Sequence, residues 1–265
     1  MEKGKAMPYV IAICHQKGGV AKTTTTLALA ACLVEKHAET LMVDLDPQAN
    51  LTASIGIDSS EALYSIAEAL IGKADLATVR LETSLPGLDI IPSNSGMLSI
   101  SRELYQIADY EYRLRQILSS PAIKDYEFVL LDCPPSIGPL MITALTAADL
   151  LLIPTQCEYF SIQALMDMFE LVKVVRDKTN PELVYRLLVT MFDKRGNFHA
   201  RMLAQLREYF NEGILQTIIG FDTKLREAQA AGQPITIHAP QSRGAEQYRQ
   251  LAEELYDYVS TKSQI

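Results

Sequence analysis

The stretch ICHQKGGVAKTTTTL, at residues 13–27, decides how this chain folds. An apolar run at residues 9–13 leads into it and predicts a short buried strand, and an Ala- and Leu-rich run at residues 27–34 predicts a helix. A strand, a glycine-containing loop and a helix in this order bind phosphate, because backbone N–H groups and the helix dipole point at the anion. The pattern predicts that Lys22 contacts the β- and γ-phosphates of a nucleotide and that the Thr23 hydroxyl coordinates Mg²⁺.

The loop departs from the strict pattern G-x-x-x-x-G-K-[ST] at both glycines. Gln16 and Ala21 stand at those positions, whereas Gly18 and Gly19 follow a second lysine, Lys17. The resulting K-G-G-x-x-K-T resembles the loop of the ParA/MinD family of partition and positioning ATPases, in which the glycine-flanking lysine is the signature residue. A Gly-Gly turn before an unrelated Lys-Thr pair is the alternative, which the order of strand, loop and helix disfavours. The resemblance implies nucleotide contacts from Lys17, Gly18, Gly19, Val20, Ala21, Lys22, Thr23 and Thr24.

The composition bounds the class of protein. With 265 residues and 48% hydrophobic content, the chain suits one α/β domain over residues 1–265, of which we expect residues 1–8 to be disordered. No apolar run approaches the roughly 18 to 20 residues of a membrane span, and the N-terminus lacks the apolar segment of a signal peptide. The four widely spaced cysteines argue against a disulfide framework, so we expect a cytoplasmic protein. The net charge of −8 speaks against a uniformly basic surface but not against a local basic face.

Apolar runs that predict strands alternate with runs that predict helices along the chain. Strands are expected at residues 9–14, 40–44, 88–92, 128–132, 150–154, 183–191 and 215–219. Helices are expected at residues 23–36, 62–71, 98–118, 139–148, 162–178, 198–210, 223–231 and 244–260. This alternation predicts right-handed crossovers between parallel strands. The expected fold is therefore α/β, a doubly wound, mostly parallel sheet with helices on both faces, as in P-loop NTPases.

Two carboxylates follow the strand expected at residues 40–44. Asp44 and Asp46, two apart on an extended chain, project to the same side. A carboxylate there can orient a water molecule on a γ-phosphate, although alone it would be read as a solvated acid in an Asp-Pro turn. The segment DLDPQAN resembles the family motif D-x-D-P-Q-x-N. The resemblance implies that Asp46 is the catalytic, water-orienting acid and that Asp44 supports Mg²⁺ through water.

A third acid follows the strand expected at residues 128–132. Asp132, after four apolar residues, has the arrangement of a Walker-B acid that holds the Mg²⁺ shell. The segment Asp132-Cys133-Pro134-Pro135 resembles the family's D-x-P-P switch, which senses the γ-phosphate. A metal-ligand role for Cys133, as in the related nitrogenase iron protein, is disfavoured against a buried thiol because no partner motif accompanies it.

The resemblance extends over roughly residues 9–258. The segment LVTMFD at residues 188–193 resembles a strand end near the nucleotide base, which makes Met191 a candidate contact. Relatives read I-P-R-N-x-R-L where this chain has Ile219-Gly220-Phe221-Asp222-Thr223-Lys224-Leu225. Because relatives use this loop to hold adenine and ribose, Gly220 and Asp222 are further candidates. SRGAEQYRQLAEEL matches the family's terminal helix.

The Lys17 side chain can have one of two positions. It can be solvated at the rim of the loop, since Lys22 already supplies a cation to the phosphates, or it can reach a second nucleotide across a dimer. The family resemblance implies the second role, in which two subunits sandwich two ATP molecules and each lysine contacts the partner's nucleotide. Lys17 and Asp46 are thus the catalytic candidates.

Ala21 leaves two conformations open. A helical backbone would favour alanine, whereas a positive φ would cost on the order of 1 kcal/mol.

Three functions are compatible with such an ATPase. For non-specific DNA binding, the candidates are Lys194, Arg195, Arg201, Lys224, Arg226 and Arg243, and the alternative is that these charges are scattered and solvated. Phe221, at a basic position of relatives, weakens that assignment. The acid-rich end LAEELYDYVSTKSQI disfavours a MinD-like membrane helix. A P-loop ligase or reductase is the third possibility.

We therefore expect a cytoplasmic, nucleoid-associated ParA-type ATPase with ATP and Mg²⁺ as cofactors and weak intrinsic activity. It would form a homodimer with ATP, bind DNA without sequence preference, bind no membrane, and position plasmid, chromosome or other cargo. A ParB-like or other adaptor protein would stimulate hydrolysis.

Overall fold

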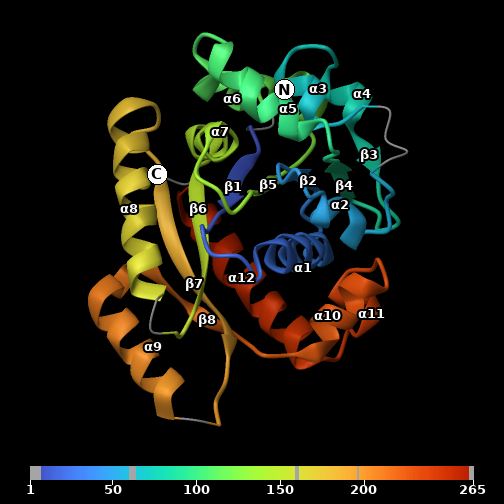
Figure 1. Cartoon of the computed structure of the whole chain (residues 1–265). Helices are drawn as coiled ribbons and strands as arrows, with labels where there is room; N and C mark the ends of the chain where they lie inside the picture. The colour runs from blue at the N-terminus through green and yellow to red at the C-terminus, as the bar shows by residue number, and fades with distance from the viewer. Residues whose placement is uncertain (1–6, 60–63, 159–160, 196, 263–265) are drawn as a thin grey trace.

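One twisted sheet runs through the molecule (Figure 1). The computed structural model describes residues 7–59, 64–158, 161–195 and 197–262. Within them the strand order is β3-β4-β2-β5-β1-β6-β7-β8, and every pair is parallel except β3 with β4. The strands are β1 (Tyr9–Ile13), β2 (Thr40–Asp44), β3 (Leu81–Glu82), β4 (Leu88–Ile91), β5 (Phe128–Asp132), β6 (Leu150–Gln156), β7 (Val184–Phe192) and β8 (Ile214–Gly220). The predicted α/β sheet is confirmed.

Helices cover both faces of the sheet. They are α1 (Lys22–Glu35), α2 (Asn50–Ser54), α3 (Ile66–Leu70), α4 (Leu76–Val79), α5 (Met97–Glu103), α6 (Arg113–Ile117), α7 (Pro139–Ala147), α8 (Ser161–Lys178), α9 (Asn197–Phe210), α10 (Thr223–Ala230), α11 (Ile235–His238) and α12 (Arg243–Lys262). Side chains alternate along β1, so Val10 and Ala12 join the core under α7 and α8, whereas Ile11 and Ile13 join the core under α1 and α12.

The helix expected at residues 98–118 is wrong as one element. The chain instead forms α5, two 3₁₀ turns (Leu104–Gln106 and Tyr110–Tyr112) and α6. The break coincides with Asp109, whose φ of 54° is left-handed, a conformation that short polar residues tolerate. Elsewhere the predicted elements agree within two residues, except that α3 begins at Ile66 and that β3, α2, α4 and α11 were not predicted.

The start of α3 has a local cause. Ser65 accepts a hydrogen bond from the Ala67 N–H at 3.1 Å, and the Glu68 carboxylate accepts one from the Ser65 N–H at 2.8 Å. This capping box fixes the first turn. Residues 60–63, where the prediction placed the helix start, lie outside the described residues.

The register brings the predicted motifs together. Asp132 on β5 pairs with Asp44 on β2 and with Ile13 on β1, so the two acids and the loop after β1 meet at one edge. β6, β7 and β8 end on the other side of β1 at the same edge. This is where ligands bind in open parallel sheets.

Two expectations concern the whole chain. Of the residues expected to be disordered, 1–6 lie outside the described part, and Met7 and Pro8 precede β1 without regular structure. That residues 1–265 form a single domain stays a prediction. No helix in the described ranges combines the length and the apolar character needed to cross a bilayer.

Candidate active site

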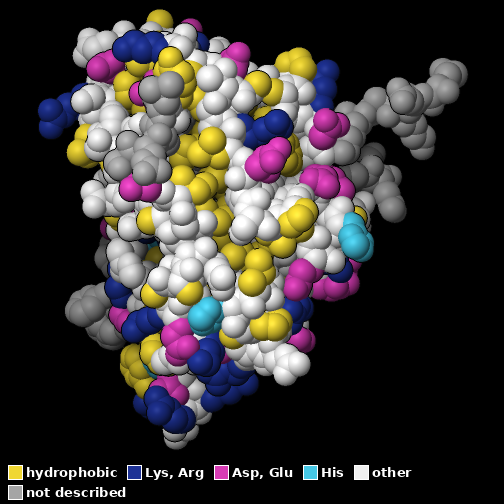
Figure 2. All heavy atoms as spheres, turned by 90° about the vertical axis from the view of Figure 1, so that its right-hand side faces the viewer, with side chains coloured by type: hydrophobic (Ala, Val, Ile, Leu, Met, Phe, Trp, Pro, Cys, Tyr) yellow, Lys and Arg dark blue, Asp and Glu magenta, His cyan; other side chains and the backbone are white. Residues whose placement is uncertain are grey.

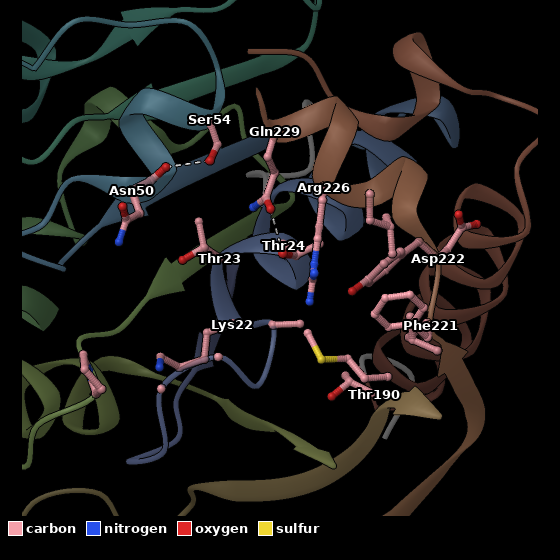
Figure 3. A pocket seen from close by; sticks show the side chains of 18 of the residues that line it. Lys22, Thr23, Thr24, Asn50, Ser54, Thr190, Phe221, Asp222, Arg226 and Gln229 are labelled. Atoms are coloured by element: carbon pink, nitrogen blue, oxygen red, sulfur yellow. Dashed lines mark hydrogen bonds between the residues drawn. The ribbon is translucent and has the colours of Figure 1, made fainter. Parts of the chain in front are cut away.

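A cavity of about 530 Å³ opens at the carboxyl edge of the sheet (Figure 3). Six residues of the β1–α1 loop and α1 line it. The other lining residues follow β2 and β5, lie on α2, at the ends of β7 and β8 and in the loop after β8, or belong to α10 and α12. The predicted site residues among them are Gly18, Gly19, Ala21, Lys22, Thr23, Thr24, Asp46, Met191, Gly220, Asp222 and Arg226. Of the residues predicted to contact nucleotide or metal, four do not line the cavity: Lys17, Val20, Asp44 and Asp132.

The loop before α1 contains two residues with left-handed backbones. Gly19 has a φ of 73°, and Ala21, the residue preceding α1, has φ 70° and ψ 33°. Ala21 is therefore left-handed, which answers the question that the sequence left open. No side chain caps α1, so the first N–H groups of the helix are available to a phosphate. Lys22 is 8% exposed, and Figure 3 shows it with Thr23 and Thr24 on one side of the cavity.

Replacing Ala21 by glycine will stabilise the fold. The left-handed alanine costs about 1–2 kcal/mol, and glycine loses about 0.4–1 kcal/mol through its freer unfolded state, so we expect a net gain of about 0.5–1 kcal/mol. Differential scanning calorimetry should record a melting temperature about 1–4 °C higher. Ala200→Gly, at an exposed position inside α9, is the matched control and should lower stability by about 1 kcal/mol. A melting temperature that falls for both variants would contradict the strain at Ala21.

Two buried carboxylates lie behind Thr23. The Thr23 hydroxyl donates to Asp132 Oδ2 at 2.7 Å, and Asp44 Oδ2 accepts from the Thr52 N–H and hydroxyl at 2.9 and 2.8 Å. Burial raises the pKa of Asp44 to about 6. Burial, followed by the charge of Asp44, raises the pKa of Asp132 well above its usual value. A cation beside these acids would relieve this cost.

The oxygens of Thr23, Asp132 and Asp44 suit Mg²⁺ better than a metal ion that is coordinated only by protein side chains. Within the described ranges, no group of three or more His, Cys, Asp or Glu side chains could hold a metal ion. Mg²⁺ retains water and is bound by few protein ligands together with phosphate oxygens. A Thr23 hydroxyl backed by Asp132 and Asp44 suits that chemistry, and the metal roles of these three residues remain predictions.

Asp46 faces the cavity from the end of β2. Its Oδ1 accepts a hydrogen bond from the Gln48 N–H at 3.0 Å, and its backbone carbonyl accepts one from the Ser93 hydroxyl at 2.7 Å. The carboxylate is therefore held in one orientation, at the cavity wall that also contains Gln48 and Asn50. Gln48 and Asn50 belong to the segment DLDPQAN, but the sequence analysis did not predict that they line the cavity.

Lys17 is held by its own subunit. Its ammonium donates to Gln156 Oε1 at 3.1 Å and forms an ion pair with Glu158. The Gln156 amide nitrogen donates in turn to the Gly19 carbonyl at 3.1 Å and to Met191 Sδ at 2.8 Å. Gln156 and Glu158, at the end of β6, were missed by the sequence analysis, because only the fold brings them to the loop.

The imidazole of His15 binds the main chain of the same loop. Its Nδ1 accepts a hydrogen bond from the Lys17 N–H at 2.9 Å, and the side chain is buried. Burial, and then the charges of Lys22 and Lys17, lower the pKa of His15 to about 4. The ring is therefore neutral near pH 7, as an accepting Nδ1 requires. Val20 is also buried, and its carbonyl accepts from the Thr190 hydroxyl at 3.1 Å.

The loop after β8 forms the opposite wall of the cavity. Asp222 Oδ1 caps α10 by accepting from the Lys224 N–H at 3.0 Å, and its Oδ2 accepts from the Gly244 N–H at 2.8 Å. Arg243 donates to the Phe221 carbonyl and lies over Gly220, where a Cβ would meet the guanidinium at 3.4 Å. Asp222 and Arg243 thus shape the loop, and their predicted roles toward base and DNA stay predictions.

The predicted DNA-binding residues do not gather at one point. Lys194 is exposed beside Arg195, which pairs with Asp193 at 2.7 Å, and Lys224 pairs with Glu227 at 2.6 Å. Arg201 on α9 lines a separate shallow hollow, and Arg226 lines the main cavity. Lys and Arg side chains nevertheless gather at the lower end of the face in Figure 2, where Figure 1 places the connection from β7 to α9.

Several named proteins are similar in sequence to this chain over almost its whole length. Residues 8–185 match the family described as an AAA domain. The sporulation initiation inhibitor protein Soj of Bacillus subtilis strain 168 is 38% identical over 251 residues, which cover 94% of this chain and 98% of that protein. The chain belongs to the ParA/Soj family of P-loop partition ATPases. The chromosome partitioning protein ParA of Myxococcus xanthus strain DK1622 is 36% identical to this ParA-type ATPase over 255 residues, covering 96% and 90% of the two chains.

A solved structure agrees with the ParA-type fold. Cobyrinic acid a,c-diamide synthase from Mycobacterium smegmatis, with an ATP analog and magnesium bound, superimposes with a TM-score of 0.85 at 30% identity. The match covers 96% of this chain and 97% of that one.

Proposed function

We propose that this ParA-type ATP hydrolase, with ATP and Mg²⁺ as cofactors, forms a homodimer with ATP that binds DNA without sequence preference. A ParB-like or other adaptor stimulates its weak activity, and the dimer positions plasmid, chromosome or other cargo on the nucleoid in the cytoplasm. The placement of Lys17 carries the proposal. Its ammonium lies outside its own cavity, at the protein surface, whereas Lys22 occupies the cavity.

The chain's own groups divide the work of hydrolysis. The uncapped N–H groups at the start of α1 and Lys22 hold the phosphates, and Asp46 orients the attacking water. Thr23, Asp132 and Asp44 would hold Mg²⁺, which would supply positive charge for phosphoryl transfer. Lys17 of each subunit contacts the nucleotide of the other, so the dimer forms with ATP and loosens after the γ-phosphate leaves.

Release of Lys17 from Glu158 should favour the dimer. Glu158→Gln removes an ion pair whose side chains are 34% and 50% exposed, which is worth at most about 1 kcal/mol. We expect the ATP-bound dimer to form about two- to five-fold more tightly, as measured by sedimentation equilibrium. Glu253→Gln, which frees Lys36 from a similar surface pair on α12, is the matched control and should have no effect. Unchanged or weaker dimerisation of Glu158→Gln would contradict the idea that this pair restrains Lys17.

DNA binding is tested by its salt dependence. With ATP present, affinity for random duplex DNA should fall several-hundred-fold between about 50 and 300 mM salt if about four phosphates are contacted. Arg201→Ala should weaken all sequences equally and flatten this slope. A gel-shift affinity that does not change with salt would overturn the DNA part of the proposal.

A small-molecule ligase is the second candidate, because the solved structure with 30% identity is a synthase. The discriminating measurement is ATPase activity with DNA plus an adaptor, compared with activity in the presence of a small carboxylic acid. Stimulation by the acid alone would favour the ligase.

A further inference from the structure

Among the predicted DNA-binding residues, Arg226 alone lines the main cavity. It belongs to α10, where Leu225 and Ala228 are buried against the core, whereas Arg226 and Gln229 line the cavity. Gln229 Oε1 accepts a hydrogen bond from the Thr24 hydroxyl at 3.2 Å, which ties this face of α10 to the start of α1. Figure 3 shows the Arg226 side chain hanging from α10 into the cavity between Thr24 and Phe221.

An aromatic ring holds the guanidinium in place. The Arg226 Cζ atom lies 5.3 Å from the centroid of the Phe221 ring, a distance at which a cation interacts with the π-face. Phe221 is 44% exposed, and its backbone is fixed because Arg243 donates to its carbonyl. In the described part of the chain Arg226 forms no ion pair, whereas the neighbouring Lys224 is neutralised by Glu227.

The two cations of the cavity lie at different places along it. Lys22 begins α1 at the phosphate-binding loop, and Arg226 reaches in from the side of Phe221 and Asp222, past Thr24. The negative charge of a nucleotide runs from the terminal phosphate to the α-phosphate, which adjoins the ribose. A guanidinium can pair with a phosphate through its edge while its face stacks on an aromatic ring.

We propose that Arg226, stacked on Phe221, binds the α-phosphate of the nucleotide. Arg226 is then a nucleotide-binding residue and not part of the DNA-binding surface. The inference deepens the proposed function, because it assigns the second cation of the same cavity. It also gives a role to the exposed Phe221, since its ring fixes the position of the Arg226 guanidinium.

Nucleotide affinity tests the proposal. Arg226→Ala should weaken ADP and AMP by about ten-fold each, because both contain the α-phosphate, and adenosine by less than two-fold. ADP is measured by titration calorimetry, and AMP and adenosine as competitors of a fluorescent ADP analogue. Arg207→Ala removes an equal charge from an exposed position on α9, outside the cavity, and should leave all three affinities unchanged. Wild-type affinity of Arg226→Ala for ADP, or an equal loss for adenosine, would overturn the α-phosphate contact.

The role of the ring is tested by a double-mutant cycle. Phe221→Leu should weaken ADP by about three-fold, and Phe221→Leu combined with Arg226→Ala should be no weaker than Arg226→Ala alone. Effects that multiply would show that ring and guanidinium act independently, which overturns the stacked pair.

Failure of the proposed function has a different signature. If the wild-type chain does not bind ADP, the cavity is not a nucleotide site at all. If Arg226→Ala binds ADP normally but loses DNA affinity at saturating ATP, Arg226 belongs to the DNA surface and the inference is overturned.

Discussion

Lys17→Ala abolishes ATP-dependent dimerisation and retains ATP binding within about ten-fold: this is the expected result with the largest effect. Lys17 does not line the cavity, whereas Lys22 lines it and is the cation that we propose for the phosphates. Removing Lys17 should therefore leave the binding site of the same subunit largely intact and take away the contact that we propose with the partner's nucleotide. Light scattering after gel filtration, with ATP and Mg²⁺, should find a monomer.

The control for Lys17→Ala is Lys36→Ala. Lys36 is also partly exposed and also pairs with a glutamate, Glu253, but it lies at the end of α1. It should form the ATP-bound dimer normally. A normal dimer in Lys17→Ala would refute the role of Lys17 in trans, whereas a complete loss of ATP binding would show that Lys17 serves its own cavity.

Asp46→Asn should lower the rate of ATP hydrolysis by about 10²–10⁴-fold. The amide oxygen can still accept the hydrogen bond that the Gln48 N–H donates to Oδ1, so the side chain keeps its orientation and loses only its charge and basicity. ATP binding and dimerisation should persist, and the dimer should accumulate because its nucleotide is not consumed. Phosphate release, measured at saturating ATP with and without stimulation, gives the rate.

Asp125→Asn is the control for this variant. Asp125 is an exposed acid that precedes β5, whereas Asp132 and the cavity are at the other end of this strand. Its substitution should leave hydrolysis unchanged. Hydrolysis by Asp46→Asn within a few-fold of the wild-type rate would remove Asp46 from the mechanism.

The sequence was sufficient for the parts of the site that follow single strands. Asp44, Asp46 and Asp132 each end or follow an apolar strand, and parallel strands bring their carboxyl ends to one edge. Their proximity therefore needed only the strand assignment. The backbone conformation of Ala21 could not be predicted from the strand assignment. Both a helical and a left-handed Ala21 are compatible with a helix that begins at Lys22.

Contacts between distant segments were the part that the sequence could not supply. Lys17 and Glu158 are 141 residues apart, and neither flanking pattern indicates that they pair. The direction of Arg226 depends on the rotation of α10, which the buried Leu225 and Ala228 fix only once β8 is in place. The irregular chain between α5 and α6 likewise contains an extended residue, Ile107, and a left-handed residue, Asp109, in a segment whose apolar spacing suits a continuous helix.

The amide of Gln156 links the main chain of the phosphate-binding loop, the Lys17 ammonium and Met191 on β7. Its nitrogen is engaged by the Gly19 carbonyl and by Met191, so its oxygen is left to face Lys17. A glutamate there would hold the lysine more tightly but lose the donor to the loop, and a leucine would lose both. The shape of the phosphate loop and the position of the lysine therefore cannot be altered independently by substitutions at residue 156.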